Sequence, residues 1–427
     1  MSRSRESLYA AMDVGTTKVA TLIARVSSQG AIEVVAAGHA PSEGMRKGQV
    51  VSPSELVGPI RASAAEAEAM LGRRLPPVLV GITGSHLHCI NAGSGEPAAQ
   101  RRARAISQND VDHLLSATAA SGAGRGDRVV QVVPRSFAVD ELAGVHDPVG
   151  MSGERLRAEA HVVYGNAASM ETLERVLRTA DIPVRGMVLE HLASAEAVLT
   201  NDERAAGVVL VDIGGGTSDI AIYQDGALLH TASVPVAGQH FTSDLAVGMG
   251  MPLSIAEAVK LEHGNVSLEG VDSRSSIAVP TGIGDQTRLV STLTLRHLLH
   301  DRATELMKMT LARVADSGLR RMPPGGIVLT GGCANLQGLV ELAAGYGRCH
   351  ARLGAPADAL GLPAELRESA FATAVGLLVW GVQHRHAGAF MAEQPVRVSL
   401  ASRLRGWLGR WQNPMHQPRQ RPTGARV

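Results

Sequence analysis

Two short turns in this sequence, about 200 residues apart, have residue types that can bind phosphate. Each follows an apolar run that ends in an aspartate, and a second apolar run leaves each turn. The first is Asp13-Val14-Gly15-Thr16-Thr17-Lys18 and the second is Asp212-Ile213-Gly214-Gly215-Gly216-Thr217. Backbone N–H groups, hydroxyls and a Lys ammonium all donate hydrogen bonds to phosphate oxygens. Two such turns facing each other would clamp a triphosphate, and we expect Asp13 and Asp212 to hold Mg²⁺ through its water shell.

The glycines argue against a chance pattern. Three consecutive glycines cost backbone entropy on folding, so a plain turn seldom uses them. They are useful where a backbone has to approach a bulky anion closely. The first turn taken alone is equally well explained as a surface turn with a solvated Lys18, since short glycine motifs recur by chance. The two turns together favour a nucleotide site.

A third glycine site, Gly331-Gly332, follows a run of residues typical of a buried strand. A glycine pair at such a place lets a flat base or a ribose lie against the backbone. A helix is expected to begin at Asn335, because leucines and a valine follow at helical spacing. This third site would bind the adenosine part of the nucleotide.

The apolar runs indicate which elements position these residues. Leu8 to Val14 and the run from Val19 are predicted strands, so the first turn is the tip of a hairpin. The same pattern surrounds the second turn. Glu257 and Lys260 lie three residues apart on a predicted helix and therefore share a face. Without further context this pair is an ordinary surface ion pair.

Length and composition fit a globular protein of two or more domains. The chain has 427 residues, of which 45% are hydrophobic and 19% are charged. Its net charge of +1 gives no reason to expect nucleic acid as a partner. Three cysteines without metal-like spacing are typical of a reducing compartment. The longest apolar run, of about a dozen residues, is too short to span a bilayer.

The C-terminal region has the pattern of an amphipathic helix. Apolar residues form one stripe, and arginines lie on both sides of it. The residues expected to bind a membrane are Leu400, Arg403, Leu404, Arg405, Trp407, Leu408, Arg410 and Trp411. Arginines beside a Trp/Leu stripe are typical of a helix in the headgroup layer of an anionic membrane. The alternative is a last helix that docks on the protein core.

The order of the three glycine motifs resembles the actin, Hsp70 and sugar-kinase superfamily. Within it, five segments resemble the FtsA family of bacterial cell-division proteins: Gly44–Gly48, Asp147–Gly153, Val211–Asp219, Gly326–Gly332 and Ala372–Leu377. The resemblance extends from about Ala11 to Trp411. It implies an α/β, actin-like fold with two lobes around a nucleotide cleft, an inserted subdomain of the FtsA type, and a C-terminal amphipathic helix.

The resemblance also implies a role for each motif in binding ATP and Mg²⁺. The first phosphate loop would consist of Asp13, Gly15, Thr16, Thr17 and Lys18, and the second of Asp212, Gly214, Gly215, Gly216 and Thr217. Gly331 and Gly332 would contact the adenosine, and Glu257 with Lys260 the ribose. Glu190 would begin a helix at the position where filament-forming relatives orient the attacking water. The alternative is a helix-start carboxylate favoured by the macrodipole.

The expected domain organisation follows from this resemblance and from composition. We expect residues 1–83 and 164–205 to form the first lobe, residues 84–163 the inserted subdomain, and residues 206–385 the second lobe. A partner-binding subdomain would span about 248–310. A linker at 386–397, the amphipathic helix at 398–412 and a disordered basic tail at 413–427 would complete the chain.

The implied function is that of a cell-division adaptor. Such a protein polymerises on the cytoplasmic face of the inner membrane at the septum, anchors FtsZ filaments through their C-terminal tail, and recruits later division proteins through its inserted subdomain. Arg302 and Glu305 are the candidate contacts with FtsZ, and a solvated helical charge pair is the alternative. ATP would act chiefly as a switch for polymerisation, with weak or no hydrolysis. The alternatives are a pilus-assembly ATP-binding protein and a small-molecule kinase of the same superfamily.

Overall fold

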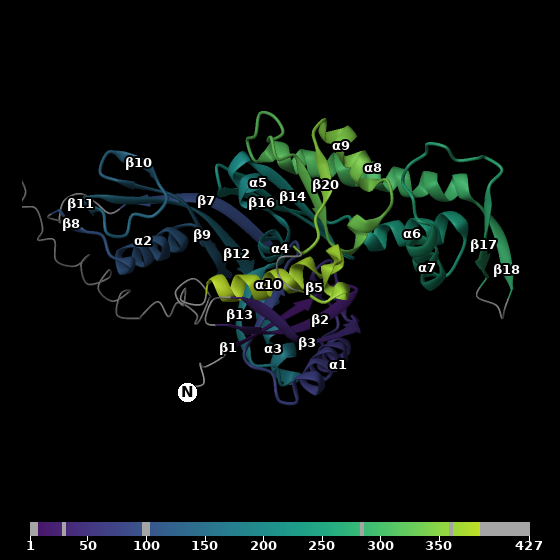
Figure 1. Ribbon diagram of the computed structural model, residues 1–427, viewed down its shortest axis with the longest axis horizontal. Helices are drawn as coiled ribbons and strands as arrows, with labels where there is room; N and C mark the ends of the chain where they lie inside the picture. Colours follow the sequence, from purple (N-terminus) through teal and green to yellow (C-terminus); the bar gives the residue numbers. More distant parts are fainter. Residues whose placement is uncertain (1–6, 28–30, 96–102, 282–285, 358–361, 385–427) are drawn as a thin grey trace, which may run out of the picture. The chain divides into compact units, whose positions relative to one another are not determined.

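Two five-stranded sheets form the centres of the two lobes. The computed structural model describes residues 7–27, 31–95, 103–281, 286–357 and 362–384. In the first sheet the order is β13-β6-β1-β2-β3, and in the second it is β16-β15-β14-β19-β20 (Figure 1). The first consists of β1 (Ser7–Val14), β2 (Lys18–Val26), β3 (Ile32–Pro41), β6 (Val78–Ile82) and β13 (Val184–Leu189). The second consists of β14 (Val208–Ile213), β15 (Ser218–Gln224), β16 (Ala227–Val234), β19 (Ile327–Thr330) and β20 (Ala351–Leu353).

The two sheets have the same pattern of pairing. In each, the first three strands form an antiparallel meander, and the first strand pairs in parallel with the strand on its other side. Of the central strands, β14 is buried along its whole length and β1 from Ala10 to Val14, as expected for strands covered on both faces. Both phosphate turns therefore join the first two strands of a sheet, at the same edge.

Helices cover the sheets and fill the space between them. In the first lobe, α1 (Pro53–Leu71) packs on β2 and β3, and α3 (Ala167–Thr179) contacts α1. Helix α4 (Glu190–Val198) follows β13 directly, and α10 (Ala372–Gln383) packs against it and against β1 and β2. Their crossing is close, since a Cβ atom added at Gly376 would lie 1.8 Å from the carbonyl oxygen of Ala193. Glycine is needed at this position for the two backbones to meet.

The second lobe extends into a helical subdomain. It contains α6 (Gly238–Met249), α7 (Leu253–His263), the hairpin of β17 (Ser276–Pro280) and β18 (Thr287–Ser291), and the long helix α8 (Thr292–Asp316).

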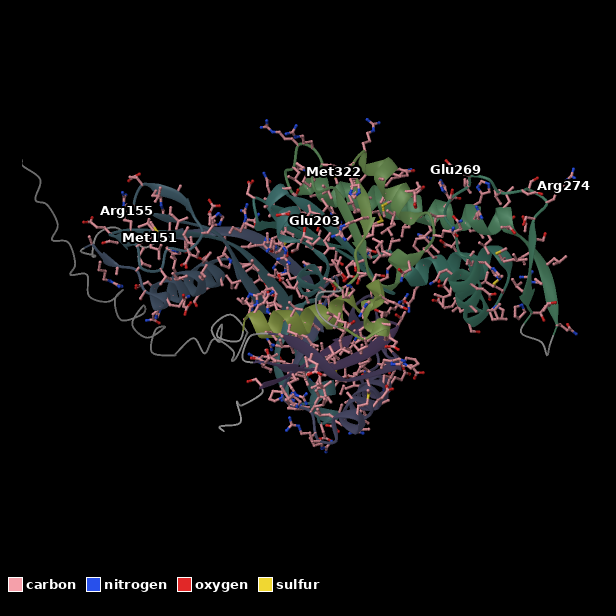
Figure 2. All side chains as sticks on the ribbon, in the orientation of Figure 1. Met151, Arg155, Glu203, Glu269, Arg274 and Met322 are labelled. Atoms are coloured by element: carbon pink, nitrogen blue, oxygen red, sulfur yellow. The ribbon has the colours of Figure 1, made fainter. Side chains whose placement is uncertain are left out.

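Helix α5 (Asn201–Ala206) is joined to β20 by an ion pair, in which Arg352 Nε lies 2.6 Å from Glu203 Oε1 (Figure 2 labels Glu203).

One expected helix begins later than its sequence indicates. We expected a helix from Asn335, but residues Gly332–Asn335 form a 3₁₀ turn, and α9 spans Leu339–Gly347. The physical reason is Gly338, which precedes α9 with φ of 81°, in the left-handed region where a right-handed helix cannot continue. The leucine spacing was correct for the helix but did not locate its start.

A separate α/β unit is inserted after β6. Its sheet has the order β10-β9-β12-β7, with β7 (Leu87–Gly95), β9 (Asp127–Val139), β10 (Leu142–Val145) and β12 (Leu156–Asn166), and it is packed by α2 (Gln108–Ser121). It contacts β16 of the second lobe through fully buried His161, whose Nε2 lies 2.9 Å from Thr231 Oγ1. Burial, with smaller contributions from nearby His230 and His191, lowers the pKa of His161 to about 3. This imidazole is therefore a neutral link between the insert and the second lobe.

The C-terminal expectations concern residues that the structure does not describe. The linker at 386–397, the amphipathic helix at 398–412 and the basic tail at 413–427 all lie outside the described residues. Among the helices that are described, none combines the length and the apolar run needed to cross a membrane.

Candidate nucleotide-binding cleft

The two phosphate turns have the same backbone geometry. Gly15 N–H donates to the carbonyl of Lys18 at 2.9 Å, and Gly214 N–H donates to the carbonyl of Thr217 at 3.0 Å. Each turn therefore has two residues at its tip, Thr16-Thr17 in the first and Gly215-Gly216 in the second. The aspartates that precede the turns, Asp13 and Asp212, occupy the same place in their hairpins.

The tips of the two turns touch each other, which explains the glycines of the second. A Cβ atom added at Gly215 would lie 2.3 Å from Thr17 Cγ2, and one added at Gly216 would lie 2.5 Å from Thr16 Oγ1. Real Cβ atoms do not approach other heavy atoms so closely. The two lobes can therefore meet at this point only because the second turn has no side chains.

The cleft around these turns has a volume of about 370 Å³. Every residue that the sequence predicted to bind ATP lines it: Asp13, Gly15, Thr16, Thr17, Lys18, Asp212, Gly214, Gly215, Gly216, Thr217, Glu257, Lys260, Gly331 and Gly332. Glu190 lines it as well. Segments separated by more than 300 residues in the sequence are thus brought to one surface.

The floor of the cleft is acidic. Burial raises the pKa of both Asp13 and Asp212 to about 6, helped by the charge of Asp212 in the first case and of Asp219 in the second. Ser194 Oγ, at 2.5 Å, and Thr373 Oγ1, at 3.2 Å, donate hydrogen bonds to Asp212 Oδ2 and work against that shift.

These carboxylates fit an indirectly held cation. Two buried carboxylates with raised pKa values are stabilised in their charged form by a nearby divalent ion. Within the described residues, no group of three or more His, Cys, Asp or Glu side chains is placed to coordinate a metal directly. Asp13 and Asp212 are the residues that would hold Mg²⁺, through its water molecules.

Lys18 contacts both the cleft and the segment that leads into α10. Its ammonium donates to the carbonyl of Ala370 at 2.6 Å and lies 3.5 Å from the centroid of the Phe371 ring. Burial lowers the pKa of this ammonium, and Asp13 opposes the change. The residue predicted to bind phosphate is therefore already held by two contacts within the chain.

The ion pair of Glu257 and Lys260 and the third glycine loop line the same cleft. Lys260 is buried, the Glu257 side chain is 43% exposed, and the Lys260 ammonium lies 2.7 Å from Glu257 Oε2. Lys260 also donates to Thr242 Oγ1 at 2.9 Å. Gly331 has φ of 88°, and a Cβ atom there would lie 2.4 Å from Asp212 Oδ1. Glycine thus brings the third loop against the second phosphate loop.

Sequence reasoning missed several polar residues of the cleft. Ser194 and Thr373 come from α4 and α10 and reach Asp212 only because these helices cross. Asp219 was part of the second motif and pairs directly opposite Asp212 in the hairpin register, so its spacing could have identified it. Thr83, Gln239, Asn335 and Glu368 also line the cleft, without any motif that indicates them.

The candidate partner contacts lie on α8, outside the residues that line this cleft. Arg302 forms a two-bonded ion pair with Asp244 of α6, with Nε–Oδ2 of 2.6 Å and Nη2–Oδ1 of 2.8 Å, and it also bonds Glu305. The Glu305 side chain is half exposed. Arg302 therefore joins two helices of this chain, and Glu305 is paired with it while half of its side chain stays exposed.

Comparison with known proteins decides the family. The family model described as "Cell division protein FtsA" matches residues 209–376, and the one described as "SHS2 domain inserted in FTSA" matches residues 84–164. The cell division protein FtsA of Pseudomonas aeruginosa is 35% identical over 406 residues, which cover 93% of this chain and 96% of that protein. The chain belongs to the FtsA family. FtsA of Escherichia coli strain K12 is 33% identical over 411 residues, covering 94% of this chain and 97% of that protein.

Solved structures confirm the predicted actin-like fold of this FtsA-family chain. The structure titled "PilM-PilN type IV pilus biogenesis complex" has a TM-score of 0.64 at 15% identity, covering 88% of this chain and 98% of that one. MreB 5 of Spiroplasma citri, bound to AMPPNP, has a TM-score of 0.53 at 13% identity, covering 90% of this chain and 98% of that one. At these identities the likeness concerns the fold alone.

Proposed function

We propose that this FtsA-family chain binds Mg²⁺ and ATP in the cleft, polymerises on the inner face of the cell membrane, and anchors FtsZ filaments there. The observation that carries the nucleotide part is the contact between the two phosphate turns. Its geometry requires glycine in one turn and leaves the hydroxyls and Lys18 of the other beside the acidic floor. A triphosphate with its cation would provide both the anion for these donors and the positive charge for the carboxylates.

The fold neighbours support ATP as the ligand. The MreB 5 structure with a TM-score of 0.53 contains AMPPNP, an ATP analogue. In this chain Glu257, Lys260, Gly331 and Gly332 line the same cleft as the two phosphate turns.

ATP in this proposal acts mainly as a switch. Glu190 begins α4, and burial together with Asp13, Asp219 and Asp212 raises its pKa well above the usual range. A carboxyl at this position can orient a water molecule. We therefore assign Glu190 the role of positioning water, with ATP acting chiefly as a switch.

The membrane and the FtsZ tail are the proposed partners. Family membership and the amphipathic pattern of residues 398–412 support membrane attachment. Helix α8 is the proposed contact with the FtsZ tail, with half-exposed Glu305 as the contact residue. Arg302 would position α8 for this contact through its ion pair with Asp244 of α6. Later division proteins would bind the inserted subdomain.

The experiment is co-sedimentation with anionic vesicles. The full-length protein, a version ending at Pro395, and a Leu404→Asp variant would be compared with and without Mg-ATP, in the presence of a labelled FtsZ C-terminal peptide. We expect only the full-length protein to pellet with lipid, more so with ATP because polymers bind through many helices at once, and to carry the peptide with it.

The matched control is Ser402→Asp. Ser402 lies on the opposite face of the predicted helix from Leu404, so this change adds the same charge without interrupting the apolar stripe. It should pellet nearly as well as the parent protein. If the version ending at Pro395 pellets equally well, the membrane proposal is wrong. If ATP does not bind at all, a soluble adaptor without a nucleotide switch takes its place.

A further inference from the structure

A short segment of the first lobe, residues 44–50, lies where the two phosphate turns meet. It contains a small hairpin of β4 (Met45–Arg46) and β5 (Gln49–Val50), with Lys47 and Gly48 at its tip. We call residues 44–50 the strap. Gly48 lines the nucleotide cleft together with Thr83 and Glu190, whereas the neighbouring Lys47 is not among the residues that line it.

Backbone contacts connect the strap to both phosphate turns. Gly48 N–H donates to Thr16 Oγ1 of the first turn at 3.4 Å. On the other side, a Cβ atom added at Gly216 of the second turn would lie 3.0 Å from Lys47 N and Cα. The strap is thus a part of the first lobe that packs directly on the phosphate loop of the second.

Lys47 has an unusual conformation and an available charge. Its φ is 49°, in the left-handed region that side chains other than Asn, Asp and Gly seldom adopt. Strained backbone of this kind is concentrated at functional sites. Lys47 is half-buried, and in the described part of the chain no carboxylate forms an ion pair with it. Its charge is close enough to α6 to add to the effect of burial in lowering the pKa of His240.

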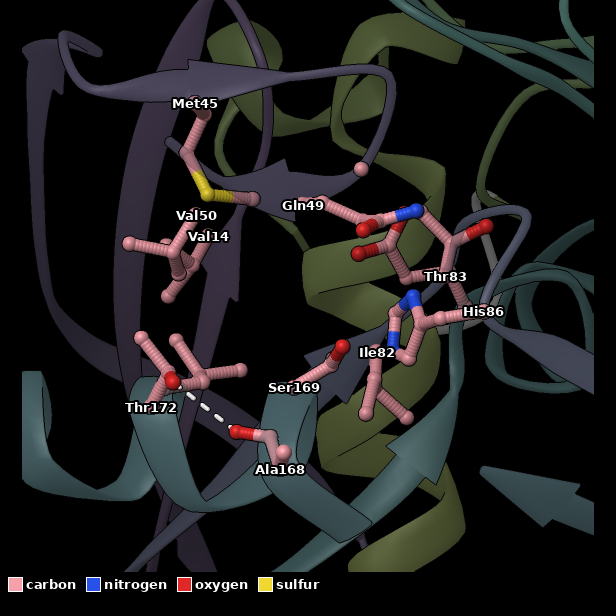
Figure 3. Close-up of a pocket in the computed structure, with 14 residues that line it drawn as sticks. Val14, Met45, Gln49, Val50, Ile82, Thr83, His86, Ala168, Ser169 and Thr172 are labelled. Atoms are coloured by element: carbon pink, nitrogen blue, oxygen red, sulfur yellow. Dashed lines mark hydrogen bonds between the residues drawn. The ribbon is translucent and has the colours of Figure 1, made fainter. Parts of the chain in front are cut away.

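The strap also covers a second cavity, of about 190 Å³, next to the nucleotide cleft. Figure 3 shows Met45, Gln49 and Val50 of the strap on one side of this cavity, with Ser169 and Thr172 of α3 opposite. Gly48, Thr83 and Glu190 belong to the walls of both cavities. The strap therefore has open space beneath it.

We propose that Lys47 is a specificity-determining residue that binds the γ-phosphate and makes the strap distinguish ATP from ADP. The inference rests on the proposed ATP binding, and it adds the Lys47 ammonium as the group that recognises the γ-phosphate. The Lys47 ammonium would neutralise charge on the γ-phosphate. Lys18 of the first phosphate turn would be a second positive charge near the phosphates. Because the strap contacts the second phosphate turn, loss of the γ-phosphate would loosen the contact between the lobes.

The test is calorimetric titration of the full-length protein with ATP and with ADP, both with Mg²⁺. In Lys47→Asn the charge is removed, while asparagine suits the left-handed backbone. We expect this variant to bind ATP about tenfold more weakly, the usual loss for one hydrogen bond between charged groups. Its ADP affinity should change less than about twofold, because ADP lacks the phosphate that Lys47 contacts. Lys47→Arg keeps the charge and should retain most of the ATP affinity.

The neighbouring Arg46→Gln is the matched control, since Arg46 is exposed and its loss changes the net charge equally. It should leave both affinities unchanged. Equal losses for ATP and ADP in Lys47→Asn, no loss at all, or the same selective loss in Arg46→Gln would each overturn the inference. If the unsubstituted protein binds neither nucleotide, the proposed function itself fails, and the two failures are thereby distinguished.

Discussion

The two phosphate hairpins have the same topology, but the residues at their tips differ in type. Both connect the first two strands of a sheet with the same strand order, and both close with the same backbone hydrogen bond. Thr16 corresponds to Gly215 and Thr17 to Gly216, yet the contacts join Thr17 to Gly215 and Thr16 to Gly216. Such an exchange is what an approximate twofold axis produces. The first hairpin has threonine side chains at its tip, and the second has glycines, which leave room for them.

The difference extends along the strands. Asp13 faces Ala20 across its hairpin, whereas Asp212 faces Asp219. Asp212 is also held by hydroxyls from α4 and α10, the helices that cross between the sheets. The second half has thus accumulated negative charge and hydrogen-bond donors around its aspartate. The repeated fold fixes where the two turns lie, and the residues at the two tips differ, with threonines in the first and glycines in the second.

The largest expected effect concerns the crossing on which both halves depend. In Gly376→Ala the new Cβ would lie 1.8 Å from the carbonyl oxygen of Ala193, so α10 and α4 would have to separate. Overpacking against a backbone atom should lower the free energy of unfolding by about 4 kcal/mol. Urea unfolding followed by circular dichroism, without nucleotide, measures this change.

The control for that variant is Gly345→Ala in α9. A Cβ atom at Gly345 meets nothing within 4 Å, so alanine should be neutral or should stabilise the helix by up to about 1 kcal/mol. If Gly376→Ala unfolds at the same urea concentration as the parent protein, the helices can move apart at no cost. The two halves would then not be fixed by this crossing.

The next effect concerns the contact between the hairpins themselves. Gly215→Ala places a Cβ atom 2.3 Å from Thr17 Cγ2 and should force the tips apart. Because phosphate oxygens would then reach donors on one turn only, we expect ATP affinity to fall about a hundredfold. Titration calorimetry with Mg-ATP measures it.

A second substitution can show whether the steric contact is the cause. Thr17→Ala removes the methyl and hydroxyl groups nearest to residue 215, so combining it with Gly215→Ala should recover part of the lost affinity. Such non-additivity is expected only for residues in contact. If the double variant binds ATP as poorly as the product of the two single changes predicts, the clash explanation is incorrect.

The sequence predicted the parts of this site that are local and missed those that depend on packing. The hairpin tips were found because glycine, hydroxyl and lysine occur together over six residues, at the end of apolar runs. Ser194 and Thr373 were missed because each lies on a helix with no motif around it, and only the α4–α10 crossing brings them to Asp212. Likewise, nothing in the leucine spacing after Asn335 indicated that Gly338 would delay the helix.

The smallest of the three effects tests the charge on the second half. The pKa of Asp212 is raised from 3.8 to about 6 in the folded chain, chiefly by burial. A carboxyl whose folded pKa is raised stabilises the fold below the unfolded pKa, and this contribution is lost as the pH rises through about 6. Without nucleotide, the parent protein should therefore lose stability between pH 4 and pH 7.5 because Asp212 ionises. Asp212→Asn keeps an oxygen for Ser194 and Thr373 but cannot ionise.

We therefore expect Asp212→Asn to match the parent protein at pH 4 and to exceed its unfolding free energy by about 2 kcal/mol at pH 7.5, as measured by urea unfolding. Asp225→Asn is the control, because Asp225 is exposed on the β15–β16 turn in a left-handed conformation that asparagine also adopts. It should follow the parent protein at both pH values. If the variant is no more stable than the parent protein at pH 7.5, burial of the ionised Asp212 carboxylate does not destabilise the fold. A cation near Asp212 would then have no unfavourable carboxylate charge to neutralise. The two hairpins would differ only in the size of the side chains at their tips.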